Sequence, residues 1–191
     1  MEPGAAAVVG ARLRATRQAR GLSLGALAAR AKVGKGSLSE IENGARNPTL
    51  STLQALAGAL GVPLSTLLAE RSGTEVASPG IGARLLDATR HPDGTTVEVY
   101  LLHLDAGAQH LSIAHGPGVI EHLLITHGRA RVGLPGQEAE VGPGETAVWE
   151  SDAEHGYQAL GPTAVEAVLT IRSPSRDQSE AQSRDQDPAA G

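Results

Sequence analysis

The hydrophobic positions in the first third of the chain recur with the period of an α-helix. Leu24, Leu27, Ala28 and Ala31 follow the i, i+3, i+4, i+7 spacing that places them on one helix face. Similar apolar stripes, ended by glycine or preceded by proline, recur along the chain up to about residue 70. This pattern predicts an all-α domain of five short helices over residues 8–69.

After about residue 80, apolar and polar positions alternate instead. Residues 96–104, TVEVYLLHL, form one such run, and turns such as Pro92-Asp93-Gly94 separate it from its neighbours. Many short strands at this spacing are typical of a β-sandwich or barrel. We therefore expect an all-β barrel over residues 81–171.

The remaining segments show neither pattern. Residues 70–80, ERSGTEVASPG, are mostly small and polar, which predicts a linker. The C-terminal tail repeats SRDQ and contains almost no apolar residue. A segment of that composition cannot bury enough apolar surface to fold. We expect residues 1–7 and 172–191 to be disordered.

The charge of the chain changes at the same boundary. The net charge is −5, but residues 1–70 carry eight Lys/Arg against four acidic residues, and residues 71–191 carry eight against seventeen. All seven histidines and all three aromatic residues lie after residue 90. The two halves therefore read as separate domains, and the basic half favours a polyanionic partner.

Composition also excludes several classes of protein. The chain has no cysteine, which rules out disulfides and thiolate metal sites. No apolar run approaches the ~20 residues of a membrane span. The N-terminus does not resemble a signal peptide, because its basic residues follow the apolar stretch. These features predict a cytoplasmic protein with no membrane partner.

The second and third predicted helices are joined by a short connection, Lys32-Val33-Gly34. A helix-turn-helix needs such a tight joint, because its second helix must project into the major groove of DNA. The segment LSLGALAARAKVGKGSLSEIENGARNPTLSTLQALAGALGV resembles the lambda-repressor-like helix-turn-helix of the Xre family of bacterial regulators. The resemblance implies a double-stranded DNA operator as partner and a homodimer that reads near-palindromic half-sites.

The resemblance also assigns roles to individual residues. Arg17 and Glu42 match a pair that forms an internal salt bridge, so we expect them to be structural. Lys35 could donate to guanine, and Glu40 could accept from cytosine. The residues expected at the DNA interface are Ser23, Leu24, Lys35, Gly36, Ser37, Glu40, Asn43 and Arg46. Leu24 has no polar side chain, so only its backbone N–H could contact a phosphate.

The β half resembles a cupin, a double-stranded β-helix with two metal-binding motifs. Glu121 and Gly128 have the spacing of the first motif, and Gly144 and His155 fit the second. The first motif normally carries two histidines, and here only His115 is present. The resemblance therefore supports the fold and leaves the metal site incomplete.

Two readings of this cluster remain open. His115, Glu121 and His155 could hold a divalent metal, because two histidines and one carboxylate can bind non-haem iron. Alternatively, the same groups and Tyr157 form a polar ligand pocket inside the barrel. We expect the pocket without a metal and no cofactor. The alternation of the strand predicts that Glu121 faces inward and His122 outward.

Together these features predict a transcriptional regulator whose cupin domain senses an unidentified small-molecule effector, and not an enzyme. The alternative is a cupin-type iron-dependent oxidoreductase with an accessory helical domain. A protein-interaction module is a weaker alternative, because the helical half is basic and the β half acidic.

Overall fold

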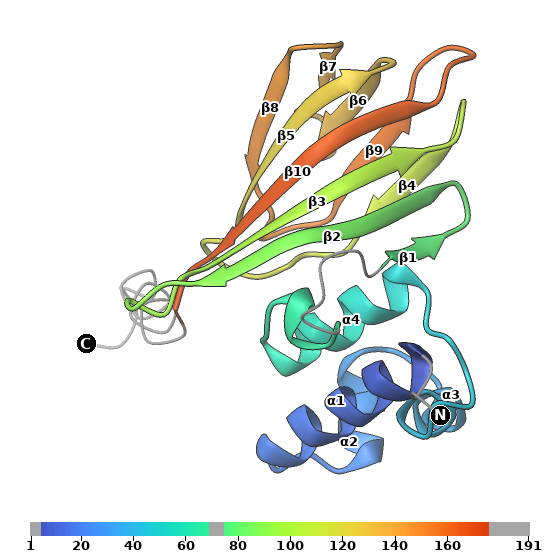
Figure 1. The fold of residues 1–191 in the computed structure, drawn as a ribbon, viewed down its shortest axis with the longest axis vertical. Helices are drawn as coiled ribbons and strands as arrows, with labels where there is room; N and C mark the ends of the chain where they lie inside the picture. Colours follow the sequence, from blue (N-terminus) through green and yellow to red (C-terminus); the bar gives the residue numbers. More distant parts are fainter. Residues whose placement is uncertain (1–4, 69–74, 176–191) are drawn as a thin grey trace.

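The computed structural model describes residues 5–68 and 75–175 (Figure 1). Residues 1–4 and 176–191, which were expected to be disordered, and residues 70–74 of the predicted linker lie outside the described residues. In the described parts of the segments expected to be disordered or a linker, three predictions were wrong. Residues 5–7 are helical, residues 75–78 form a strand, and residues 172–173 continue the last strand. Each is held by backbone pairing or packing that its composition does not reveal.

The first domain contains four α-helices among the described residues, followed by a single 3-10 turn. Their bounds are α1 (Ala5–Ala19), α2 (Leu24–Arg30), α3 (Lys35–Glu42), α4 (Leu50–Leu60) and η1 (Leu64–Thr66). The prediction of a fifth α-helix is therefore wrong, because Leu64–Thr66 form a 3-10 turn. Thr66 N–H donates to Pro63 O and Leu67 N–H donates to Leu64 O, so the segment closes with i→i+3 bonds. None of the described helices is long and apolar enough to cross a membrane.

The turn of the helix-turn-helix is made by a lysine. Lys32 N–H donates to Ala29 O, and Val33 N–H donates to Ala28 O, which is the Schellman pattern. Lys32 has φ 54°, in the left-handed region where glycine is preferred. The turn therefore lies within the Lys32-Val33-Gly34 connection expected between the two helices. Lys32 is exposed, so its side chain extends into solvent.

The helical domain is built around leucines and one ion pair. Leu13, Leu27 and Leu38 are fully buried and come from three different helices. Beside them, Arg17 Nε donates to Glu42 Oε1 at 2.6 Å, and Nη2 donates to Oε2 at 2.8 Å. Both side chains are largely buried, at 11% and 5% exposure. The expected salt bridge is confirmed, and it ties α1 to the end of α3.

The second domain consists of two separate hydrogen-bonded sheets. A six-stranded sheet has the order β1-β2-β3-β10-β5-β8, and a four-stranded sheet has the order β4-β9-β6-β7. The strand bounds are β1 (Glu75–Ser78), β2 (Ile81–Arg90), β3 (Thr96–Leu104), β4 (Gln109–Ser112), β5 (Ile120–His127), β6 (Ala130–Gly133), β7 (Ala139–Val141), β8 (Thr146–Glu150), β9 (His155–Ala159) and β10 (Val165–Ser173). The all-β prediction holds, but the barrel is not closed.

The core of the β domain lies between these sheets. Tyr100, Leu169 and Leu123 are register partners across β3, β10 and β5, and all three are buried. Trp149 and Tyr157 are also buried. All three aromatic residues therefore lie in this core, and aliphatic side chains fill the rest of it.

The helical domain packs directly against the β domain through α4 and η1 (Figure 1). Ser51 N–H donates to Ser78 Oγ at 3.1 Å, and Ser65 N–H donates to the Glu98 carboxylate at 2.6 Å. The prediction of two domains joined only by a linker did not anticipate this contact. It fixes the position of the helix-turn-helix relative to the sheets.

Glu42→Ala is expected to destabilise the helical domain by about 3 kcal/mol, because it leaves the Arg17 guanidinium buried without its partner. Urea unfolding followed by circular dichroism at 222 nm reports on the helices. Trp149 fluorescence reports on the β domain, since no aromatic residue lies in the helical half.

Glu40→Ala is the matched control on the same helix. Its ion pair with Arg46 spans 3.6 Å, and both side chains are 57% exposed. Exposed pairs of this kind contribute at most about 1 kcal/mol. Equal destabilisation by the two substitutions would contradict a structural role for the Arg17–Glu42 pair.

Candidate functional site

The outer face of α3 carries the polar side chains expected to read DNA. Lys35, Gly36 and Glu40 are exposed, whereas Leu38 and Ile41 of the same helix are buried. The apolar side of α3 holds the helix against α1 and α2. The opposite side, including its N-terminal turn, is left open to solvent.

The residues flanking this face lie beside it. Arg46 Nη1 donates to Ser37 Oγ at 3.2 Å and lies 3.6 Å from Glu40 Oε2, so these three side chains form one surface. Asn43 is exposed at the end of α3. Ser23 is the N-cap of α2, and its hydroxyl accepts from Ala26 N–H.

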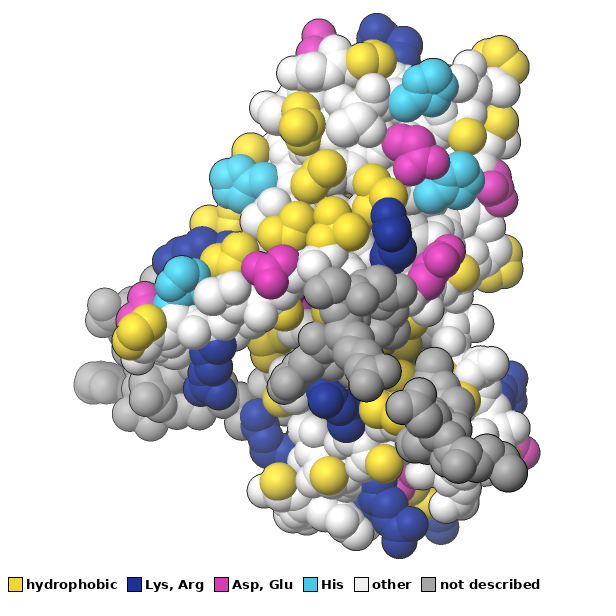
Figure 2. Space-filling model, in the orientation of Figure 1, with side chains coloured by type: hydrophobic (Ala, Val, Ile, Leu, Met, Phe, Trp, Pro, Cys, Tyr) yellow, Lys and Arg dark blue, Asp and Glu magenta, His cyan; other side chains and the backbone are white. Residues whose placement is uncertain are grey.

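Leu24 differs from the other predicted contact residues. Its side chain is half-buried and packs against the hydrophobic core. It therefore helps to hold α2 in place, and only its backbone N–H remains for a phosphate. Figure 2 shows Lys and Arg side chains spread over the helical half, where the sequence places the excess of basic residues.

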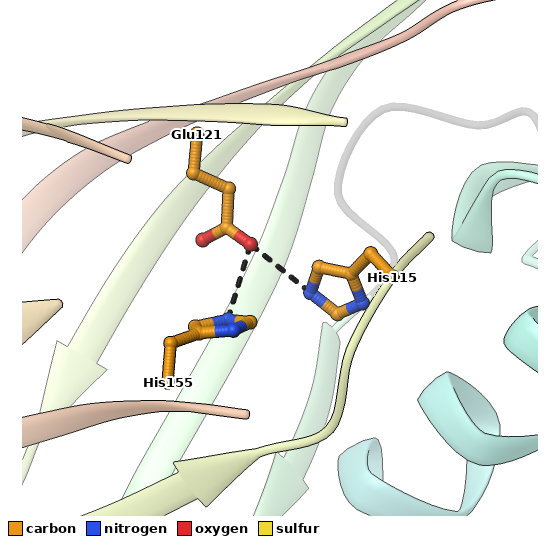
Figure 3. Close-up of side chains that lie close together, drawn as sticks. All are labelled: His115, Glu121 and His155. Carbon is orange, nitrogen blue, oxygen red and sulfur yellow. Dashed lines mark ion pairs between the residues drawn. The ribbon is translucent and has the colours of Figure 1, made fainter. Parts of the chain in front are cut away.

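A second cluster lies inside the β domain (Figure 3). Glu121 projects inward from β5, His155 from β9, and His115 from the loop after β4. Glu121 Oε1 lies 3.1 Å from Nε2 of each histidine. The predicted inward direction of Glu121 is confirmed, because burial alternates along β5 and leaves His122 exposed.

Neighbouring groups fix the orientation of these side chains. The Tyr157 hydroxyl donates to Glu121 Oε2. His155 Nδ1 lies 3.1 Å from Ala153 O, which directs Nε2 toward the carboxylate. The backbone N–H of His115 donates to Ser151 O at 2.7 Å and anchors the loop. The structure therefore brings together all four residues predicted for the pocket.

The electrostatics of the cluster favour an ionised carboxylate. Burial alone would raise the pKa of Glu121, but the His115 and His155 imidazoles outweigh it and hold that pKa far below its usual range. Burial lowers the pKa of His155, and the adjacent carboxylate more than compensates and raises it. Burial, together with the Glu121 charge, raises the pKa of Tyr157 well above its ordinary value. Tyr157 therefore stays a neutral donor.

The ligand atoms of the cluster converge in a way that fits a metal ion. One donor atom each from His115, Glu121 and His155 lies within 4.8 Å of the others. Glu121 Oε1 and His155 Nε2 are buried, and neither has a partner with hydrogen-bond geometry. Buried polar atoms normally have such partners. Two imidazoles and one carboxylate are a known donor set for divalent transition metals.

Two further residues of this region were missed by the sequence reading. The Trp149 ring lies 5.8 Å from those of His155 and Tyr157, centroid to centroid, and covers the cluster. Its alternation with Ala147 along β8 was the available signal. Glu98 on β3 is 1% exposed. Glu98 shares its strand face with Tyr100, Leu102 and Leu104, so the alternation along β3 was the available signal.

A cavity of about 310 Å³ lies between the two domains. α4 and the residues after it form one wall, and His115, Val119 and Glu98 belong to the other. Of the four predicted pocket residues, His115 is the one that lines this cavity. His115 therefore belongs to the buried cluster and also borders the cavity whose other wall is α4.

Comparison with known proteins agrees with this architecture. A helix-turn-helix family model matches residues 13–67. The HTH-type transcriptional regulator SutR of Escherichia coli is 30% identical over 165 residues, which cover 85% of this chain and 93% of SutR. The immunity repressor of Bacillus phage phi105 is 42% identical over 64 residues, or 34% of this chain and 44% of the repressor.

A solved structure matches both domains together. The HTH_3 family transcriptional regulator from Vibrio cholerae superposes with a TM-score of 0.77 at 26% identity, covering 91% of this chain and 99% of that one. The match includes the two-sheet domain. The chain therefore belongs to the Xre-like family of DNA-binding helix-turn-helix transcriptional regulators.

Proposed function

We propose that the protein is a homodimeric, sequence-specific regulator whose cupin-like domain binds a small effector. The observation that carries this proposal is the open, polar face of α3 in a domain that packs directly on the β-sheets. An effector that changes this packing would change the positions of two recognition helices. Spacing between such helices decides which half-sites a dimer can reach.

In the proposed complex, α3 enters the major groove. Lys35 donates to guanine O6 or N7, and Glu40 accepts from cytosine N4. Gly36 permits close approach to the bases. The remaining residues, Ser23, Ser37, Asn43, Arg46 and the Leu24 backbone, contact phosphates and set the register.

The dimer is proposed to form through the β domain. Leu101, Val168 and Leu124 are register partners on the outer face of the six-stranded sheet, and Val148 extends this apolar surface. Val148 is 57% exposed and Leu124 is 38% exposed. Figure 2 shows hydrophobic side chains gathered on this face. Exposed apolar patches are typical of interfaces.

A divalent metal is a second candidate ligand, favoured by the convergence of His115, Glu121 and His155. These three residues would hold it and leave further coordination positions for water or an effector. A bound metal supplies Lewis-acid or redox chemistry. Because the relatives named above are transcriptional regulators, we favour a regulatory role over the alternative of an iron-dependent oxidoreductase.

Lys35→Ala is expected to remove discrimination at one base pair, by about 1–3 kcal/mol. Arg46→Ala should weaken binding to all DNA sequences by the same factor. It should also reduce the steepness with which log K falls with log salt by about 1. Binding is measured by fluorescence anisotropy on duplexes selected from a random pool. Arg131→Ala, an exposed change on β6 of the four-stranded sheet, is the control. Unchanged affinity and specificity in both α3-region variants would refute this interface.

Val148→Lys is expected to shift the full chain from dimer to monomer, because it places a charge in the proposed apolar interface. Light scattering across a concentration series gives the mass. Leu111→Lys is the control, since Leu111 is equally exposed at 57% but lies on the other sheet. A dimer that survives Val148→Lys and is lost in Leu111→Lys would place the interface elsewhere.

His115→Ala is expected to abolish stabilisation of the protein by added Ni²⁺ or Zn²⁺. A ligand at 100 times its Kd raises the free energy of unfolding by about 2.7 kcal/mol, which thermal melting detects. His122→Ala is the matched control, because His122 is exposed on the opposite face of β5. If neither metal stabilises the wild-type chain, the cluster is a hydrogen-bonded one.

A further inference from the structure

Three carboxylates are buried among the described residues, and two of them have a basic partner. Glu42 pairs with Arg17, and Glu121 lies beside two imidazoles. Glu98 is 1% exposed and forms no ion pair with any basic group in residues 5–68 and 75–175. It is the exception among buried acids in this part of the chain.

The hydrogen bonds of Glu98 leave part of its carboxylate free. Ser65 N–H donates at 2.6 Å and the Tyr100 hydroxyl donates at 2.8 Å, and both bonds go to Oε1. No donor among the described residues reaches Oε2. A buried charge is costly unless it is paired as well as hydrogen-bonded. Within residues 5–68 and 75–175, Glu98 therefore lacks a positively charged partner.

The cavity between the domains provides room for such a partner. Glu98 lines it, and so do the apolar side chains of Val62, Val119 and Ile171. Its volume of about 310 Å³ is at the lower end of small-molecule sites. Glu98 is the one carboxylate of this mostly apolar lining, whose other polar side chains are Gln54, His115 and Ser173. A small organic cation suits this arrangement better than a bare metal ion, which requires several polar ligands.

We propose that this cavity binds a primary amine with an apolar body, whose ammonium group pairs with Glu98. The inference rests on the proposed regulatory function and names the chemical class of its effector. The amine would contact α4 and the β domain at once. Its occupancy would therefore bias the packing of the helix-turn-helix on the sheets, and by linkage operator DNA would change amine affinity by the same factor.

The test is thermal melting of the full chain, without DNA, in the presence of 2-phenylethylamine and of straight-chain amines from ethylamine to hexylamine. 2-Phenylethanol and 3-phenylpropanoate have nearly the same shape as 2-phenylethylamine but carry no positive charge. We expect the melting temperature to rise with the logarithm of amine concentration above the Kd, and the alcohol and the acid to have no such effect.

Glu98→Gln retains an acceptor oxygen for Ser65 and Tyr100 and removes the charge. It should weaken amine binding at least about tenfold, because hydrogen bonds to charged groups are stronger than neutral ones. Glu75→Gln, an exposed change on β1, should bind like wild type.

Gly58→Leu is a second variant that does not disturb Glu98. Gly58 lines the cavity from α4, and a Cβ there meets only Ala114 O at 3.7 Å. Leucine also favours the helix. This variant should fold and lose amine binding by filling the cavity.

The inference is overturned if no amine stabilises the wild-type chain, if the alcohol matches the amine, or if both variants bind like wild type. These outcomes leave the DNA-binding results untouched. Conversely, amine binding without operator binding would refute the proposed function and retain the site.

Discussion

Burying a carboxylate is costly, and this fold uses the partners that offset the cost to join distant segments. Glu42 connects α3 to Arg17 on α1, twenty-five residues away. Glu121 connects β5 to the loop of His115 and to β9. Glu98 connects β3 to the last turn of the helical domain through Ser65. The recognition helix, the buried cluster and the domain junction each depend on one such glutamate.

These contacts place the buried cluster and the DNA-binding helices in one packed unit. His115 lines the cavity beneath α4 and also contacts Glu121. The β domain contacts α4 and η1, α4 packs on α2, and α2 packs on α3. Packed side chains and four interdomain hydrogen bonds among the described residues connect the two sites physically.

Local sequence rules predicted much of the chain and failed where packing decides. The apolar stripe of Leu24, Leu27, Ala28 and Ala31 and the joint at Lys32-Val33-Gly34 follow from local sequence. The structure has both, because Leu27, Ala28 and Ala31 are buried and the chain turns at Lys32. Strand β1 lies in the segment expected to be a linker, because four residues acquire a structure only by pairing with β2.

The sequence by itself determined the two domains, the helix-turn-helix and the inward direction of Glu121. These depend on hydrophobic period and on motif spacing, which are local properties of the chain. Only the tertiary structure decided that His115, Glu121 and His155 meet, that the sheets stay separate, and that Glu98 borders a cavity with no cationic partner among the described residues. Those features arise from contacts between residues tens of positions apart, and neither propensity nor alternation encodes such contacts.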